Sequence, residues 1–88
     1  MVMRIRYTPR FKRDFAKLTH EEKAIAVQKL ELFVENQRHP SLQLKKIRGS
    51  NDFRESRVNR DIRFSWQYCE GGVRLRAIGH HDEALKEP

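Results

Sequence analysis

The residues best suited to chemistry in this sequence are an arginine and two neighbouring histidines. Arg63 lies inside an alternating apolar segment, and His80 and His81 follow the last such segment of the chain. Arginine offers a planar fork of donors that holds two phosphate oxygens at once, and histidine exchanges a proton near neutral pH. Together these side chains suit metal-free cleavage of RNA. In that reaction the ribose 2′-hydroxyl attacks the adjacent phosphorus, while protein groups move protons and neutralise the phosphorane oxygens.

Strand alternation decides which side chains can join Arg63. Apolar and polar residues alternate over residues 61–69, which assigns them to the two faces of a strand. One face carries Ile62, Phe64, Trp66 and Tyr68, and the other carries Arg63, Ser65 and Gln67. We expect the helices to cover the apolar face and the second face to stay open, so Trp66 belongs to the core rather than to the site.

Neighbouring strands can bring further polar side chains to the open face. The candidates are Arg57 and Glu55 for catalysis, and Lys45, Lys46, Arg76 and Asp82 for substrate binding. Glu55 suits either a general base or a cross-strand ion pair with Arg57 or Arg63. Because an error of one residue at the end of the last strand exchanges its two faces, His80 and His81 are both candidates for the site.

The elements that position these residues begin with a strand over residues 2–7 and two helices. Thr8 and Pro9 form a favoured helix start, followed by an apolar stripe of Phe11, Phe15 and Leu18. Thr19 and Glu22 match a capping box, so the second helix begins there and ends before Pro40. Its apolar stripe is predicted to contain Ala24, Val27, Leu30 and Val34, widened by Ile25, Leu32 and Phe33.

The second half of the chain predicts strands. Leu42 and Leu44 alternate with polar residues, and further strands follow at 53–58, 61–69 and 73–79 with short, turn-forming gaps between them. Such gaps favour an antiparallel meander. The predicted fold class is therefore α+β in the order β-α-α-β-β-β-β, with a two-helix hairpin packed on one face of a mainly antiparallel sheet. A length of 88 residues suits a single domain spanning residues 1–88.

The charge of the chain favours a polyanionic partner. Lys and Arg total 19 against 12 Asp and Glu, a net charge of +7 with neutral His. This balance is typical of nucleic-acid binders, although solubility alone also favours a charged surface. Cys69 is the single cysteine, and the sequence has neither an apolar run of membrane-span length nor a signal peptide. We expect a cytoplasmic protein without cofactor, membrane contact or organised metal site.

Three short segments, taken in their order along the chain, resemble the RelE/ParE superfamily of toxins from toxin–antitoxin systems. The segments are residues 44–49 (LKKIRG), 57–64 (RVNRDIRF) and 78–82 (IGHHD), and with the order of elements the resemblance covers nearly the whole chain. It implies a metal-independent endoribonuclease, an mRNA interferase that acts on messenger RNA at the ribosome. It also implies a cognate antitoxin protein that covers the basic surface.

The same resemblance implies roles for single residues. Arg63 matches the sheet arginine that stabilises the scissile phosphate in the family, and His81 matches the C-terminal histidine that assists proton transfer in the YoeB and YafQ branches. Arg57 aligns with a second basic position, while Lys45 and Lys46 match the lysine-bearing strand. The sequence departs from the RelE branch because Asp82, and not the tyrosine that stacks on the substrate, follows His81.

Two other functions fit the same fold. A ParE-like protein inhibits DNA gyrase without catalysis, so it would bind a protein instead of cleaving RNA, and the paired histidines speak against this alternative. A non-toxic family member would bind its antitoxin and operator DNA. For that role the basic surface suffices.

Overall fold

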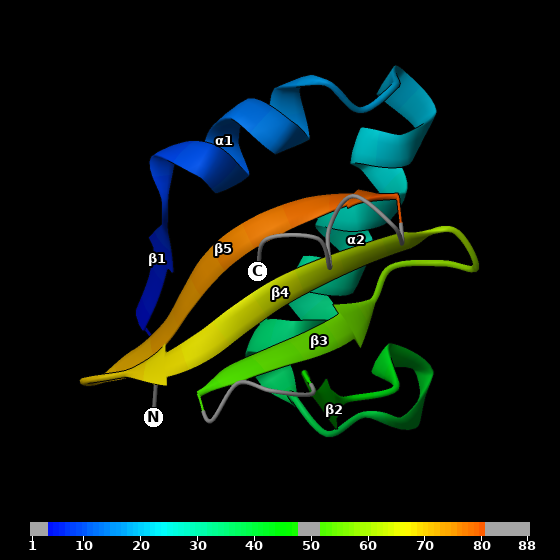
Figure 1. Ribbon diagram of the computed structural model, residues 1–88. Helices are drawn as coiled ribbons and strands as arrows, with labels where there is room; N and C mark the ends of the chain where they lie inside the picture. Colours follow the sequence, from blue (N-terminus) through cyan, green and yellow to red (C-terminus); the bar gives the residue numbers. More distant parts are fainter. Residues whose placement is uncertain (1–3, 48–51, 81–88) are drawn as a thin grey trace.

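The computed structural model describes residues 4–47 and 52–80, which form a helical layer on one face of a sheet (Figure 1). The helices are α1 (Pro9–Ala16), α2 (His20–Glu35) and the short 3₁₀ helix η1 (Pro40–Leu42). The strands are β1 (Arg4–Tyr7), β2 (Lys45–Lys46), β3 (Phe53–Arg57), β4 (Ile62–Cys69) and β5 (Gly72–His80). This order confirms the predicted β-α-α-β-β-β-β architecture.

Side-chain caps begin both long helices where the sequence predicts. The Thr8 hydroxyl accepts a hydrogen bond from the backbone N–H of Phe11 at 3.1 Å, and Pro9 occupies the first turn of α1. At α2 the capping box is complete. The Thr19 hydroxyl accepts from the Glu22 N–H at 3.1 Å, and the Glu22 carboxylate accepts from the Thr19 N–H at 2.8 Å. These caps satisfy N–H groups that a helix start leaves without partners.

The five-stranded sheet has the order β1-β5-β4-β3-β2. β1 pairs with β5 in parallel, and every other pairing is antiparallel. This confirms the mainly antiparallel sheet. The parallel pairing depends on a close approach at Gly72, because a Cβ atom there would overlap the backbone carbonyl of Arg4. Gly71 turns the chain between β4 and β5 with a φ of 79°, a conformation that glycine adopts without a steric penalty.

The core lies between α2 and the helix side of the sheet. Phe33 of α2 packs edge-on against Phe64 and Trp66, at ring-centroid distances of 5.2 and 4.8 Å. All three side chains are fully buried. The predicted burial of Trp66 is confirmed, and its indole N–H donates to the Ser56 hydroxyl at 3.0 Å inside the core.

The apolar stripe predicted for α2 is wrong in part, because Leu30, Leu32 and Phe33 pack on the core but Ala24, Ile25, Val27 and Val34 are exposed. Ala26 and Phe33 are the buried residues of the helix, whereas Val27 and Val34 are 45% and 37% exposed. Apolar residues cover much of the circumference of this helix, so their spacing alone does not select a face. The large ring of Phe33 selects it, because Phe33 fills the space beside Phe64 and Trp66.

An irregularity in the pairing of β4 with β5 changes which β5 residues share a face. Ser65 lies opposite Ala77 and Trp66 lies opposite Leu75, so Arg76 is an extra residue in β5. A bulge of this kind shifts the alternation of the strand that carries it. Beyond the bulge, Ile78 lies opposite Phe64 on the helix side, and Gly79 lies opposite Arg63 on the other side.

Candidate functional site

Four of the predicted site residues meet on the sheet face opposite the helices, which we call the open face. The register pairs Arg57 with Arg63, Glu55 with Ser65, and Lys45 with Glu55, so all of these side chains project to the same side. With Gln43, the residues Lys45, Glu55, Arg57 and Arg63 line a hollow of about 90 Å³. Since a water molecule needs only about 10–15 Å³ by a comparable measure, the hollow has room for a phosphate group.

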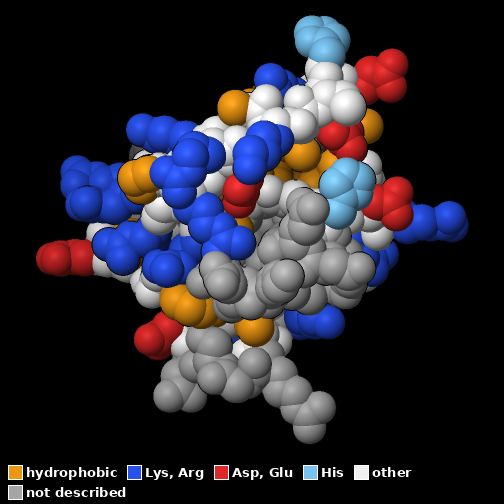
Figure 2. All heavy atoms as spheres, turned by 45° about the horizontal axis from the view of Figure 1, so that its top comes forward, with side chains coloured by type: hydrophobic (Ala, Val, Ile, Leu, Met, Phe, Trp, Pro, Cys, Tyr) orange, Lys and Arg blue, Asp and Glu red, His pale blue; other side chains and the backbone are white. Residues whose placement is uncertain are grey.

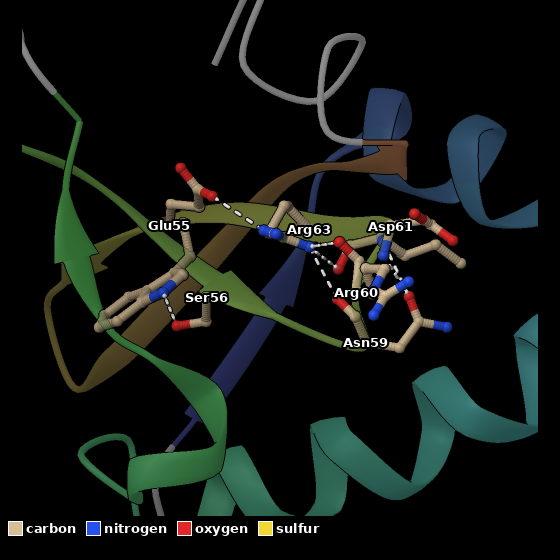
Figure 3. Close-up of polar contacts among 8 residues, drawn as sticks. Glu55, Ser56, Asn59, Arg60, Asp61 and Arg63 are labelled. Atoms are coloured by element: carbon tan, nitrogen blue, oxygen red, sulfur yellow. Dashed lines mark hydrogen bonds and ion pairs between the residues drawn. The ribbon is translucent and has the colours of Figure 1, made fainter.

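Arg63 is the central and most firmly held side chain of this hollow. Its Nη1 donates to the carbonyl oxygens of Asn59 and Arg60, both at 2.7 Å, and to that of Ile62 at 3.3 Å. Its Nε lies 3.3 Å from Oε1 of Glu55, and the two point toward one another in Figure 3. Arg63 is 8% exposed. Its Nη2 makes no hydrogen bond to the described residues, so this nitrogen can donate to a ligand.

The loop between β3 and β4 is shaped to hold Arg63. The Asn59 side-chain oxygen accepts from the backbone N–H groups of Asp61 and Ile62 at 3.0 and 2.8 Å. This Asx-type turn fixes the direction of the Asn59 carbonyl, which accepts from Arg63 (Figure 3). The sequence prediction missed Asn59 as a positioning residue. Its place in a short turn directly before a charged strand is the signal that points to it.

Three buried donors on the open face have no hydrogen-bond partner within the described residues. They are Nε of Arg57, Oγ of Ser65 and Nε of Arg76. Leaving a buried polar group unsatisfied costs about 1–3 kcal/mol, so three such groups on one face are an unusual concentration. Of the three residues, Arg57 lines the hollow, so an anionic ligand bound there would lie against its guanidinium. Ser65 is 1% exposed and was not among the predicted site residues.

Arg76 lies on the open face as predicted, on the side of the hollow nearer β1. Its Nη1 donates to Oε1 of Gln67 at 2.7 Å, and its guanidinium lies 4.4 Å from the centre of the Phe53 ring. Gln67 and Phe53 are themselves register partners on β4 and β3. These contacts hold the Arg76 guanidinium over an aromatic ring.

Two predicted site residues lie elsewhere. Lys46 pairs with Arg54 and not with Glu55, so strand alternation turns it away from the hollow. His80 lies opposite Ile62, a core residue, and therefore on the helix side of the sheet. There its Nε2 is 3.4 Å from Oε2 of Glu22, and its side chain is 59% exposed. The extra residue in β5 explains why His80 lies on the helix side.

Glu22 connects this histidine with the start of α2. The hydrogen bond from the Thr19 backbone N–H is the main cause that lowers the pKa of Glu22, and the charge of His80 adds to the effect. His80 is thus part of a helix-capping arrangement. The other two predicted site residues, His81 and Asp82, lie outside the described residues, so their roles stay predictions.

Residues 4–47 and 52–80 contain no group of three His, Cys, Asp or Glu side chains arranged to hold a metal ion. In the same part of the chain, each helix is too short or too polar to cross a membrane.

Comparison with known proteins identifies the fold through structure and not through sequence. No protein-family model matches the chain, and no curated protein sequence matches it. Solved structures of toxins do. The YafQ chain of the Escherichia coli DinJ–YafQ toxin–antitoxin complex matches with a TM-score of 0.77 at 16% identity, over 94% of this chain and 97% of that one. The chain therefore has the α+β fold of toxins from toxin–antitoxin systems.

Two further structures define the fold more narrowly. The archaeal RelE–RelB complex from Pyrococcus horikoshii matches with a TM-score of 0.72 at 11% identity, over 96% of this chain and all of that one. A mutant of E. coli toxin RelE in the free state matches with a TM-score of 0.69 at 20% identity, over 98% and 97%. The fold of this protein is that of the RelE-type toxins.

Proposed function

We propose that this protein is the toxin of a type II toxin–antitoxin system and acts as a metal-independent endoribonuclease on messenger RNA at the ribosome. The observation that carries the proposal is the set of unsatisfied donors of Arg57, Ser65 and Arg76 beside Arg63. Donors held in place without partners are what a developing negative charge requires. The RelE-type fold and the net charge of +7 support the same conclusion.

In the proposed reaction the scissile phosphate occupies the hollow between β2, β3 and β4. Nη2 of Arg63 and Nε of Arg57 donate to its non-bridging oxygens, and Lys45 adds positive charge. The negative charge on these oxygens grows as the 2′-hydroxyl attacks the phosphorus. Because three carbonyl groups and Glu55 already hold Arg63, its guanidinium needs no reorganisation during that step.

We assign proton transfer to Glu55 and His81. The Glu55 carboxylate lines the hollow and is 4% exposed, so it can accept the proton of the 2′-hydroxyl there. His80 lies on the helix side and Gly79 lies opposite Arg63. Strand alternation then predicts the open face for the residue after His80, which makes His81 the donor to the leaving 5′-oxygen. Asp82 stays a predicted substrate contact.

The proposed partners follow from the same surface. The substrate is messenger RNA in the cytoplasm, and a cognate antitoxin protein covers the basic open face and blocks access to it. The solved relatives include the DinJ–YafQ and RelE–RelB toxin–antitoxin complexes. An antitoxin that masks Arg57, Arg63 and Arg76 would also neutralise part of the positive charge.

Expression without an antitoxin tests the proposal, with the 5′ ends of transcripts mapped while DNA synthesis is followed in the same cultures. We expect growth arrest and new 5′ ends within translated messages. Arg63→Lys and His81→Ala should abolish most of this cleavage, whereas His80→Ala should retain it because His80 faces Glu22. His80→Ala is thus a matched control for a neighbouring residue of the same type.

Other outcomes contradict the proposal in distinguishable ways. Arrest of DNA synthesis with intact transcripts would identify a ParE-like gyrase inhibitor. Normal growth with soluble, folded protein would identify a non-toxic member that binds antitoxin and operator DNA. Equal loss of cleavage in His80→Ala and His81→Ala would refute the assignment of the proton donor.

A further inference from the structure

A second group of arginines lies on the open face at the opposite side of the sheet from the hollow. Arg4 and Arg6 of β1 pair with Gly72 and Arg74 of β5. Ile5 lies between the two β1 arginines and pairs with Val73, which is fully buried in the core. Alternation therefore turns Arg4, Arg6 and Arg74 away from the helices. We call these three residues the β1–β5 arginine cluster.

No acidic side chain of the described residues pairs with the positive charges of the cluster. Within residues 4–47 and 52–80, none of its three side chains makes an ion pair or a hydrogen bond. Adjacent like charges on paired strands repel one another and destabilise the sheet. By contrast, Arg63 and Arg76 on the same face are held by Glu55 and Gln67. A cluster that the protein leaves uncompensated is suited to a polyanion.

The surface beside the cluster is shaped for nucleic acid. Arg6 and Arg74 line an open hollow of about 440 Å³ together with Tyr7, Thr8 and Pro9. Tyr7 pairs with the core residue Leu75, and its ring lies 5.6 Å from that of Phe11 on the helix side, so the charged wall of this hollow comes from Arg6 and Arg74. Positively charged grooves bind single-stranded nucleic acid by pairing with its phosphates, and this contribution does not depend on the sequence of the strand.

The cluster and the catalytic hollow lie along one continuous path on the open face. Arg74 is the register partner of Gln67, which is four residues from Arg63 along β4. With about 3.3 Å per residue and about 4.8 Å between strands, Arg63 and Arg74 are roughly 14 Å apart. Arg76, whose guanidinium lies over the Phe53 ring, is in β5 between the residues opposite Trp66 and Ser65, and therefore between Arg74 and Arg63 along the sheet. Figure 2 shows Lys and Arg side chains gathered on the side of the molecule where β1 and α1 lie.

We propose that the β1–β5 arginine cluster is a second phosphate-binding subsite, which holds the single-stranded RNA substrate a few nucleotides from the bond that is cut. The inference rests on the proposed ribonuclease function for its substrate. Its role is to bind and orient the strand. It would supply affinity through charge without reading sequence, so the RNA must be long enough to reach from the hollow to β1.

Binding of uncleavable RNA tests this subsite without depending on catalysis. The probe is a single-stranded 2′-O-methyl RNA of about ten nucleotides, which lacks the attacking hydroxyl, and a 2′-O-methyl dinucleotide serves as the short probe. For Arg6→Ala/Arg74→Ala we expect about tenfold weaker binding of the long probe at low salt. The slope of log K against log salt should fall by roughly 1.4, because two phosphate contacts on a single strand contribute about 0.7 each. Binding of the dinucleotide should not change.

Two variants separate a local contact from a general effect of charge. Lys23→Ala/Arg38→Ala removes the same charge from α2 and the segment after it. We expect that variant to keep the slope of the unchanged protein. Arg6→Lys/Arg74→Lys should retain most of the slope because the positive charges stay in place. Circular dichroism and thermal unfolding of each variant check the fold.

Failure of the subsite and failure of the proposed function give different results. An unchanged slope in Arg6→Ala/Arg74→Ala, or an equal change in Lys23→Ala/Arg38→Ala, overturns the subsite even if transcripts are cleaved. The subsite is also overturned if Arg6→Ala/Arg74→Ala loses affinity for ribosomal subunits but binds the single-stranded probe unchanged. That result would indicate that the cluster contacts ribosomal RNA. A reduced slope in a protein that cleaves no RNA supports the subsite while refuting the nuclease.

Discussion

The ion pair between Arg63 and Glu55 should contribute to stability and to catalysis in ways that a double-mutant cycle can separate. The pair is 3.3 Å long, and its side chains are only 10% and 5% exposed. Removing one partner of a buried pair destabilises a protein by about 3–5 kcal/mol. Arg63→Ala also removes the donor for three backbone carbonyls of the β3–β4 loop. We therefore expect Arg63→Ala to lower the free energy of unfolding by about 3–5 kcal/mol.

That loss is large for a protein of this size. A domain of 88 residues has a free energy of unfolding of roughly 4–13 kcal/mol, and about 1 kcal/mol shifts its Tm by roughly 4–8 °C. The Tm of Arg63→Ala should thus fall by at least about 12 °C. Glu55→Gln combined with Arg63→Ala removes the buried negative charge, so the double variant should regain about 1–3 kcal/mol.

Cleavage should follow a different pattern. Loss of one preorganised donor to a developing oxyanion lowers kcat by about 10²–10³, and Glu55→Gln does not replace that donor. Urea unfolding of the unchanged protein, the two single variants and the double variant gives the free energies of unfolding. Cleavage by the same four proteins, measured well below each Tm, gives kcat. The double variant also lacks Glu55, the proposed base, so recovery of its cleavage together with its stability would refute the catalytic roles of both Arg63 and Glu55. Additivity of the two single changes within about 0.5 kcal/mol would refute the coupling.

Three further predictions concern the loop, the helix cap and the sheet edge. Asn59→Ala should lower kcat about tenfold by releasing the loop that orients Arg63, and Asn59→Asp, which keeps the accepting oxygen, should restore most of it. Because its hydrogen bond lowers the pKa of Glu22, ionised Glu22 stabilises α2 at neutral pH, and this contribution disappears as the pH falls through the folded-state pKa. Glu22→Gln should therefore lower the Tm at pH 7, and the difference should shrink as the pH falls below the ordinary glutamate pKa of about 4.3; a pH-independent difference would contradict the effect. Gly72→Ala should separate β1 from β5, seen as a lower Tm and a smaller salt slope for RNA binding, because the added Cβ overlaps Arg4.

The sequence was sufficient to predict the order of elements and the faces of the central strands. Alternation in β4 is unambiguous, since its apolar residues occupy every second position, and it correctly separates Arg63 from Trp66. The caps at Thr8 and Thr19 are local patterns that depend on neighbouring residues alone. Features of this kind need no knowledge of tertiary contacts.

Features that depend on tertiary packing could not be predicted in the same way. The buried face of α2 depends on where Phe33 meets the sheet. β2 is only two residues long, so the choice between Lys45 and Lys46 depends on the pairing with β3 rather than on a pattern. Gln43 lines the hollow and has a left-handed backbone conformation itself, with a φ of 47°, which non-glycine residues rarely adopt.

The choice between the two histidines depends on a single extra residue in β5. Strict alternation from Val73 and Leu75 would place position 79 on the helix side, and His80 beside Arg63. The bulge at Arg76 reverses that order, so Gly79 lies opposite Arg63 and His80 meets Glu22. The sequence carries a signal of this reversal. Strict alternation after Val73 and Leu75 would give an apolar residue at 77, but the large apolar residue is Ile78, one position later. Arg74 and Arg76 lie two residues apart and share the open face by ordinary alternation, so the inserted residue determines the side on which His80 lies and not the path of the arginines.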